Sequence, residues 1–230
     1  RGLGDVYKRQ MEQNLSKKTR TESDLIGSRE VPESALYGVQ TLRGIENFRI
    51  SKFHLNEYPL FIQALAITKM GAAVANRELD LLTEEQTDAI LKACKEILEG
   101  KHHDQFPVDM IQGGAGTTTN MNANEVIANR ALELMGHARG EYHYCSPNDH
   151  VNRSQSTNDA YPTAIHIGLY YTHLKLVKHF ATLIEAFRKK GAEFAHIIKM
   201  GRTQLEDAVP MTLGPVSYTH LRAHETLMNL

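Results

Sequence analysis

Hydroxyl and amide side chains gather at three places in this sequence, each beside a predicted helix end. The first is the glycine turn GGAG at 113–116, which is followed by Thr117, Thr118 and Thr119. Backbone N–H groups at a helix N-terminus, with hydroxyls beside them, form a ready site for an anion. The segment lacks the Gly-Lys-Ser/Thr ending of a P-loop and the third glycine of a dinucleotide fingerprint. Taken alone, it is either an anion site or an ordinary glycine-rich loop with a polar cap.

The second place is the string SQSTNDAYP at 154–162, just before the longest predicted helix. Ser156, Thr157 and Asn158 all carry hydrogen-bond donors there. They either face an anion or form an ordinary helix cap, and the residues alone favour the two interpretations about equally.

The third place is the string GRTQLED at 201–207, a predicted turn after that helix. Thr203 and Gln204 add two more neutral donors, whereas Arg202 is expected to pair with a carboxylate. All three places therefore offer hydroxyls and amides as candidate ligands for a small anion.

The other polar residues indicate neither metal chemistry nor a preformed nucleophile. Five histidines lie in polar loops without the i, i+4 pairing and third ligand that a zinc site requires: His102, His103, His137, His143 and His150. No G-x-S-x-G elbow occurs, and no cysteine stands beside a glycine turn and a histidine. We therefore predict no metal and no cofactor.

The composition excludes several classes of partner. The chain has 230 residues, 41% of them hydrophobic, with 26 lysines and arginines against 27 aspartates and glutamates. This near-neutral balance provides no basic surface for nucleic acid or for an anionic membrane. No apolar run approaches the roughly 18 to 20 residues of a membrane span. Cys94 and Cys145 have no metal or redox spacing, which favours reduced thiols in a cytoplasmic protein.

Helices must position most of these residues. The stretch 21–50 alternates short extended pieces with turn residues, which predicts a small hairpin and irregular loops. Beyond it the apolar residues follow a helical period, and four helices are predicted: 60–79, 84–99, 120–135 and 162–200. The second begins with a capping box from Thr83 to Gln86. The fourth begins at Pro162, where a missing N–H costs little.

The fourth helix carries an apolar seam that decides the architecture. Apolar or small residues recur every seven positions, interleaved with three phenylalanines: Tyr170, Val177, Ile184, Gly191 and Ile198, with Phe180, Phe187 and Phe194. A helix on the order of 55 Å long cannot bury such a stripe against a small globule alone. The predicted fold is therefore mainly α. A small helical N-terminal domain (11–158) with a short β-hairpin precedes the first long helix of a central helical bundle (159–214).

Both ends of the sequence look foreign to the rest. RGLGDVYKRQ precedes Met11, and PVSYTHLRAHETLMNL begins abruptly after Gly214. These stretches resemble adaptor or assembly-junction sequence. We therefore expect 1–10 and 215–230 to be artefactual, which leaves about 204 residues of native sequence.

Three long strings indicate a family: GAGTTTNMNANEVIANRALELMG (114–136), PNDHVNRSQSTNDAYPTA (147–164) and KMGRTQLEDAVPMTLG (199–214). In this order they resemble the aspartase/fumarase superfamily of homotetrameric lyases. With REVPESALYGVQTLRGIENFRIS near the start, the resemblance covers 21–214. It implies the helical fold of that superfamily and a homotetramer in the full-length protein.

Within the superfamily the residues favour the aspartases. The string QSTNDAYP at 155–162 is similar to aspartases, whereas fumarases usually read Ser-Ser-Asn-Asp, with Thr-Phe before the proline. Gln204 points the same way, since fumarases, and some aspartases, carry histidine there. The resemblance therefore implies an aspartate ammonia-lyase, which eliminates ammonia from L-aspartate in the anti sense to give fumarate. Class II fumarate hydratase is the alternative.

The resemblance also implies roles for six substrate-binding residues. Removing the proton beside the β-carboxylate turns that group into an enediolate-like dianion, which preorganised donors stabilise. Three residues would supply these donors: Thr117, Ser156 and Thr157. Asn158 would hold the amino group, Thr203 would bind the α-carboxylate, and Gln204 would stand beside the departing ammonia.

One expected part does not occur in the sequence. In this superfamily the general base is a serine on a mobile loop of pattern Gly-Ser-Ser-x-Met-Pro-x-Lys-x-Asn, and no such string is present. We therefore expect no catalytic base in this chain, which would be the N-terminal portion of the enzyme. The alternative from another class is that these 230 residues are a non-catalytic fragment.

Overall fold

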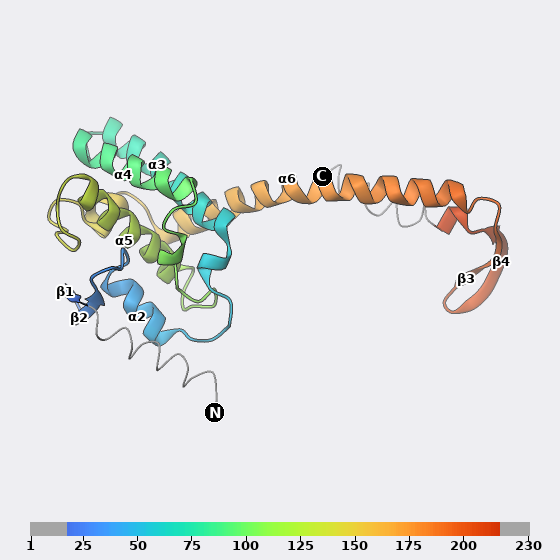
Figure 1. Ribbon diagram of the computed structural model, residues 1–230, viewed down its shortest axis with the longest axis horizontal. Helices are drawn as coiled ribbons and strands as arrows, with labels where there is room; N and C mark the ends of the chain where they lie inside the picture. Colours follow the sequence, from blue (N-terminus) through green and yellow to red (C-terminus); the bar gives the residue numbers. More distant parts are fainter. Residues whose placement is uncertain (1–17, 217–230) are drawn as a thin grey trace, which may run out of the picture. The chain divides into compact units, whose positions relative to one another are not determined.

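The computed structural model describes residues 18–216, whose helices and strands are labelled in Figure 1. These residues divide into two compact units, the first ending at Leu169 and the second beginning at Tyr170. Each unit is described separately below. The expected domains, 11–158 and 159–214, stay a prediction.

The expected foreign ends fall mostly outside the described residues. All of 1–10 and most of 215–230 belong to the parts of the chain that the structure does not describe. Their assignment as artefactual sequence stays a prediction as well.

A two-stranded antiparallel sheet opens the first unit: β1 (Thr19–Asp24) and β2 (Gly27–Pro32). It confirms the hairpin expected within 21–50. The same stretch also contains helix α2 (Val39–Asn47), where only loops were expected. That part of the prediction is wrong.

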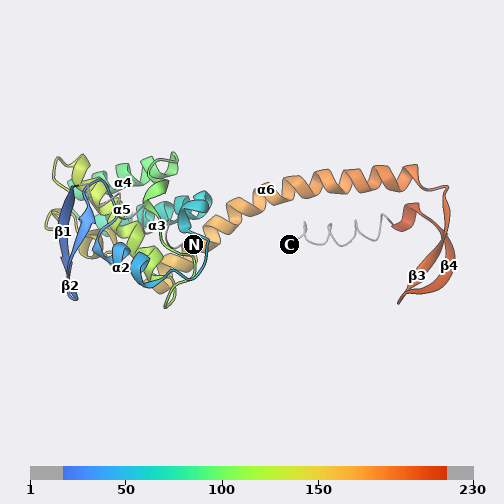
Figure 2. The same ribbon diagram turned by 60° about the horizontal axis from the view of Figure 1, so that its bottom comes forward.

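Three helices form the core of the first unit and confirm the sequence prediction: α3 (Pro59–Glu78), α4 (Glu84–Leu98) and α5 (Thr117–Leu134). The expected capping box between Thr83 and Gln86 is present at the start of α4. Helix α4 packs against both α3 and α5, as Figures 1 and 2 show. Their apolar side chains form one core. Three short helical turns lie before, between and after these helices: η1 (Leu55–Glu57) before α3, η2 (His103–Gln105) between α4 and α5, and the π-helical η3 (Pro147–Val151) after α5.

A distant carboxylate caps α2, which is why its own sequence does not reveal the helix. Gly38 precedes the helix and provides no side-chain cap. Glu125 of α5 instead accepts hydrogen bonds from three backbone N–H groups at 2.8 to 3.0 Å: those of Gly38, Gln40 and Thr41. Unpaired N–H groups at a helix start need such partners. The cap is therefore tertiary and cannot be read from local sequence.

Helix α6 (Thr157–Glu193) begins and ends earlier than predicted. Pro162 lies inside it, not at its start. Residues 198–200, expected to end the helix, instead begin a second hairpin, which continues through the expected turn: β3 (Ile198–Thr203) and β4 (Glu206–Thr212). Gly201 suits the hairpin, because it lies against β4, where a Cβ would meet the Val209 carbonyl oxygen at 2.9 Å.

The apolar seam of α6 is partly covered within the described residues. The buried members are Ile184 and Gly191. Four members are half-buried: Val177, Phe180, Phe187 and Phe194. Tyr170 and Ile198 are exposed. The helix ends before Phe194, so the seam is shorter than the four heptads expected. The mainly α fold with a short hairpin and a long helix is nevertheless confirmed.

Two further findings concern the described residues alone. No helix within 18–216 is long and apolar enough to cross a membrane. Cys94 and Cys145 are both free and buried. Burial raises the pKa of each thiol to about 12, so both are neutral at ordinary pH.

Candidate functional site

Gly116 positions the start of α5. It precedes Thr117, the first residue of that helix, and its φ of +86° is a left-handed conformation that favours glycine. A Cβ at this position would overlap the ring of Tyr161 on α6. Two features therefore require glycine at this position: the backbone conformation and the close approach of the ring.

The first residues of α5 offer free hydrogen-bond donors. Among the residues that the structure describes, the backbone N–H groups of Thr117 and Thr118 have no partner, whereas that of Thr119 donates to the Gln112 side chain at 2.9 Å. The Thr117 side chain is exposed. Because a helix N-terminus carries about half a positive charge, this end of α5 suits an anion.

The start of α6 holds three of the predicted substrate-binding residues. Ser156 precedes the helix, and its hydroxyl accepts a hydrogen bond from the backbone N–H of Asn158 at 3.2 Å. Thr157 is half-buried, and Asn158 is exposed. Pro162 has no N–H to donate to the carbonyl of Asn158 four residues earlier. That carbonyl therefore has no ordinary helical partner and can accept a hydrogen bond from a ligand.

Two contacts bring the starts of α5 and α6 together. Tyr161 lies against Gly116, and the Asn120 side chain, one turn into α5, donates to the Thr157 hydroxyl at 3.3 Å. Phe61 of α3 meets the Tyr161 ring edge to face, with 5.6 Å between ring centres. The structure thus brings four of the six predicted residues into one region: Thr117, Ser156, Thr157 and Asn158.

Lys69 of α3 is the polar residue of this region that sequence reasoning missed. Its side chain is 0% exposed. Nζ donates to three amide oxygens: Asn120 Oδ1 at 2.8 Å, Asn152 Oδ1 at 2.9 Å and Gln155 Oε1 at 2.9 Å. A lysine on a helix normally reaches water, so its type gives no hint of burial. The available signal is its position four residues from Leu65 and from Ala73, both on the buried stripe of α3.

The three amide oxygens around Lys69 match the N–H donors of its charged form. Burial away from water lowers the pKa of the ammonium to about 7. An ammonium has three N–H donors, which match the three oxygens one to one. A neutral amine has only two, and one oxygen would then face its lone pair. The geometry therefore fits the ammonium better than the amine.

Thr203 and Gln204 lie in the second unit, at the turn that joins β3 and β4. Thr203 pairs with Glu206, which leaves a two-residue turn of Gln204 and Leu205. Their φ values of +48° and +68° lie in the left-handed region, which such residues rarely adopt. All of these side chains are exposed. The resemblance implies a site assembled from three subunits, so Thr203 and Gln204 are not expected to face the other four residues within one chain, and their assignment to the substrate stays a prediction.

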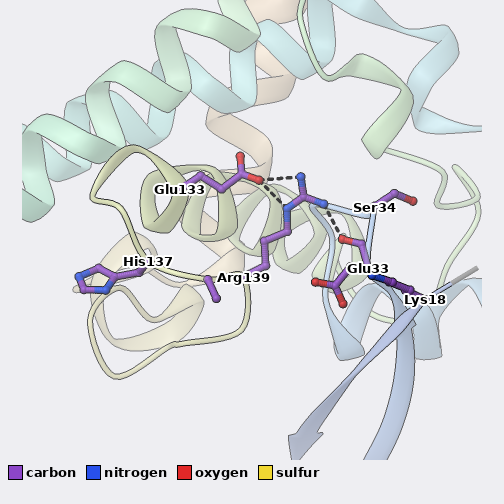
Figure 3. Close-up of a pocket in the computed structure, with 7 residues that line it drawn as sticks. Lys18, Glu33, Ser34, Glu133, His137 and Arg139 are labelled. Carbon is purple, nitrogen blue, oxygen red and sulfur yellow. Dashed lines mark hydrogen bonds and ion pairs between the residues drawn. The ribbon is translucent and has the colours of Figure 1, made fainter.

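A cavity of about 550 Å³ opens elsewhere in the first unit, and Figure 3 shows its lining. Its lining includes Lys18, Glu33 and Arg139, but none of the predicted site residues. Arg139 is already paired, because Nε donates to Glu133 at 2.6 Å and Nη1 to the Glu33 carbonyl at 2.6 Å. We therefore place the candidate site at the helix starts, where donors are free.

Metal ligands do not gather in the part of the chain that the structure describes. It contains no group of three or more histidine, cysteine, aspartate or glutamate side chains that could hold an ion. The donors at the candidate site are hydroxyls, amides and backbone N–H groups, which suit a carboxylate.

The comparisons with known proteins agree with the sequence resemblance. The chain is 60% identical over 195 residues to the aspartate ammonia-lyase of Pseudomonas fluorescens, which covers 85% of this chain and 41% of that protein. It is 56% identical over 201 residues to the aspartate ammonia-lyase of Escherichia coli (strain K12), covering 87% and 42%. The chain therefore spans about two fifths of the length of these curated relatives.

Solved structures show the same fold. A fumarate lyase:delta crystallin from Brucella melitensis, bound to cobalt, matches with a TM-score of 0.86 and 50% identity, over 91% of this chain and 45% of that one. A class II fumarase from Schistosoma mansoni matches with a TM-score of 0.80 and 36% identity, over 91% and 44%. A family model described as Lyase matches residues 27–228. The chain therefore belongs to this lyase family, within the aspartase/fumarase superfamily.

Proposed function

We propose that the full-length protein is an aspartate ammonia-lyase, and that this chain supplies part of its substrate site. The single observation that carries the proposal is the joined start of α5 and α6, where hydroxyls and free N–H groups converge without a cationic cluster. Identity of 56 to 60% to proteins named aspartate ammonia-lyase supports this activity over others in the family. L-Aspartate would lose a Cβ proton and its amino group, giving fumarate and ammonia.

The donors would act on the β-carboxylate. As the Cβ proton leaves, the electron pair moves toward this carboxylate, and hydrogen bonds aimed at its oxygens strengthen as charge develops. The residues in position to do this are Thr117, Ser156 and Thr157. The elimination then completes when the pair forms the double bond and the C–N bond breaks.

Asn158 would hold the amino group that leaves. Its side-chain oxygen and the main-chain carbonyl freed by Pro162 are both acceptors, and an ammonium group needs acceptors. Thr203 and Gln204 would complete the site at the α-carboxylate and beside the leaving ammonia. We assign the general base to a serine outside these 230 residues.

The proposal also covers the location, oligomeric state and partners of the enzyme. The full-length protein would be a cytoplasmic homotetramer that binds a small dicarboxylate and neither nucleic acid nor membrane. Two free, neutral thiols are consistent with a reducing compartment. The 230-residue chain alone would release no ammonia and would not form a discrete tetramer.

A chimera tests the activity directly. The 195 matching residues of this chain would replace their counterparts in the Pseudomonas fluorescens protein, which supplies the remaining sequence. We expect the purified chimera to convert L-aspartate to fumarate, followed by fumarate absorbance, and to release one ammonia per fumarate. Thr157→Val, which keeps the side-chain shape and removes the donor, should lower kcat by roughly 100-fold or more.

The same assay separates the alternatives. A folded chimera that produces fumarate from L-malate and not from L-aspartate would replace the proposal by fumarate hydratase, which the match to a class II fumarase supports. Inactivity on both substrates would contradict the proposal. Ammonia release by the 230-residue chain alone would contradict the assignment of the base to sequence outside it.

A further inference from the structure

We propose that Lys69 is a positioning residue that fixes the direction of a hydrogen-bond chain running from its ammonium through Asn120 to the Thr157 hydroxyl, so that the hydroxyl proton points toward a bound carboxylate. This inference rests on the proposed function, because Thr157 is one of the residues assigned to the substrate. Lys69 itself would make no direct contact with the substrate.

The first step is the orientation of the amides. An ammonium has donors and no acceptor, so an amide that binds it must present its oxygen. Asn120, Asn152 and Gln155 all do so, at 2.8 to 2.9 Å from Nζ. Each amide nitrogen then points away from Lys69. Backbone carbonyls also fix Asn152 and Gln155, whereas the Asn120 nitrogen meets side-chain acceptors alone, so Asn120 is the amide whose orientation depends most on the ammonium.

The second step carries this orientation to the site. The Asn120 nitrogen donates to Asn152 Oδ1 at 3.1 Å and to Thr157 Oγ1 at 3.3 Å. Because the hydroxyl oxygen of Thr157 accepts, its proton must go elsewhere. Among the described residues no acceptor takes that proton, and Thr157 is only half-buried. The proton is left for a ligand at the helix start.

The same ammonium also anchors the loop before α6. Asn152 donates to the Gln155 carbonyl at 3.1 Å, and Gln155 donates to the Val151 carbonyl at 2.9 Å. Asn76, two turns along α3 from Lys69, donates to the Arg153 carbonyl at 2.8 Å. Helix α3 thus holds the loop in place through Lys69 and Asn76.

A purely structural role for Lys69 makes a different prediction for Asn120→Asp. A carboxylate at this position keeps its bond to the ammonium, and charge strengthens that bond. However, it loses the donor to Asn152 and can only accept from Thr157, which reverses the last link and draws the hydroxyl proton inward. If Lys69 sets the direction of the chain, the Asn120→Asp enzyme should fold but be inactive. If Lys69 has a purely structural role, the same variant should be active.

The test uses the chimera with two variants and a matched control. We expect Lys69→Met and Asn120→Asp each to lower kcat for L-aspartate by about 100-fold with KM changed less than about threefold, because the lost donor acts in the transition state. The control is Asn129→Leu. Asn129 is equally buried on α5 and also makes three hydrogen bonds, to Leu36, Tyr142 and Gly140. This variant should lose stability and keep kcat.

Each outcome decides the question. Retention of kcat by Lys69→Met or Asn120→Asp in an active chimera would overturn the directional chain. If the unsubstituted chimera is inactive, the proposed function fails, and the 230-residue chain itself supplies the second measurement by NMR. A nuclear Overhauser effect between the Asn120 amide protons and the Thr157 methyl group, lost in Lys69→Met, supports the chain. Its absence in the unsubstituted protein overturns it.

Discussion

The two regions that hold the predicted site residues are built in opposite ways. In the first unit, Thr157 receives a hydrogen bond from an amide that a buried ammonium orients, and Gly116 lies tightly against a ring. In the second unit, Gln204 stands at an exposed hairpin turn with a left-handed backbone. A nearby ion pair, Arg202 with Asp207 at 3.6 Å, is open to water.

The difference separates two ways of placing a binding group. A buried network holds a side chain through packing and directed hydrogen bonds, so a small change there disturbs many partners. A turn holds it through backbone conformation alone. Substitutions should therefore be costly at the first region and nearly neutral, or even stabilising, at the second.

The largest effect is expected from Gly116→Ala. The new Cβ combines a left-handed conformation with an overlap on the Tyr161 ring, and the stability loss should be about 3 kcal/mol. Gly100→Ala is a matched control, because its φ of +87° is nearly the same and nothing lies within 4 Å of the added atom. It should lose only about 1 kcal/mol. Urea denaturation of the chain measures both, and equal losses would contradict the close packing at Gly116.

Lowering the pH should reduce the stability of the first unit by protonating Glu96, which joins α4 to α5. Arg130 holds this carboxylate at 2.6 and 2.8 Å, and, with His102, lowers the pKa of Glu96 to about 2. A carboxyl with a depressed folded-state pKa stabilises the protein above its ordinary pKa of 4.5 and loses this contribution as pH falls toward 2. The stability advantage of the unsubstituted chain over Glu96→Gln should therefore shrink across that window, measured by thermal unfolding.

Asp207→Asn is the control from the second unit. Its partner Arg202 is exposed, and such surface pairs contribute about 0 to 1 kcal/mol. This variant should match the unsubstituted chain at every pH. A constant advantage over Glu96→Gln between pH 4.5 and 2 would show that the Glu96 pair does not act as described.

The smallest effect, and one of opposite sign, is expected from Leu205→Gly. Leu205 is 94% exposed with φ of +68°, so glycine removes strain and loses no packing. The second hairpin should gain about 1 kcal/mol, measured by amide hydrogen exchange of β3 and β4. Leu25→Gly, at the fully exposed turn of the first hairpin without positive φ, should instead weaken its hairpin by about 0.5 kcal/mol. If both variants changed the stability of their hairpins in the same direction, the contrast between the two turns would be contradicted.

Local patterns predict the elements that local forces stabilise. Helix α4 carries its own capping box, Thr83 with Gln86, and lies where the sequence predicts it. Helix α2 escapes prediction because its cap comes from Glu125. The second hairpin escapes because a heptad-like spacing continues past Glu193, and period alone does not show where a helix ends.

The candidate site divides in the same way. Hydroxyls beside a glycine turn or a helix start draw attention to Thr117 and Thr157, but the residues alone fit an ordinary cap as well, and only the family resemblance assigns the two to the substrate. Lys69 is not identifiable, because nothing in the sequence of α3 says that three amides, 51 to 86 residues further on, will surround it. Polar networks between distant segments are visible only once the chain is folded.

The carboxylate cap of α2 has a consequence for the order of folding. Glu125 lies 84 to 87 residues after the three N–H groups that it holds, so these groups have no partner until α5 has formed and docked, and only the Val39 N–H of the first turn is held by Glu22 of β1. A nine-residue helix is too short to persist in water by itself. During synthesis, α2 is therefore expected to form only after α5 has been made, and a stable α2 indicates that α5 has docked.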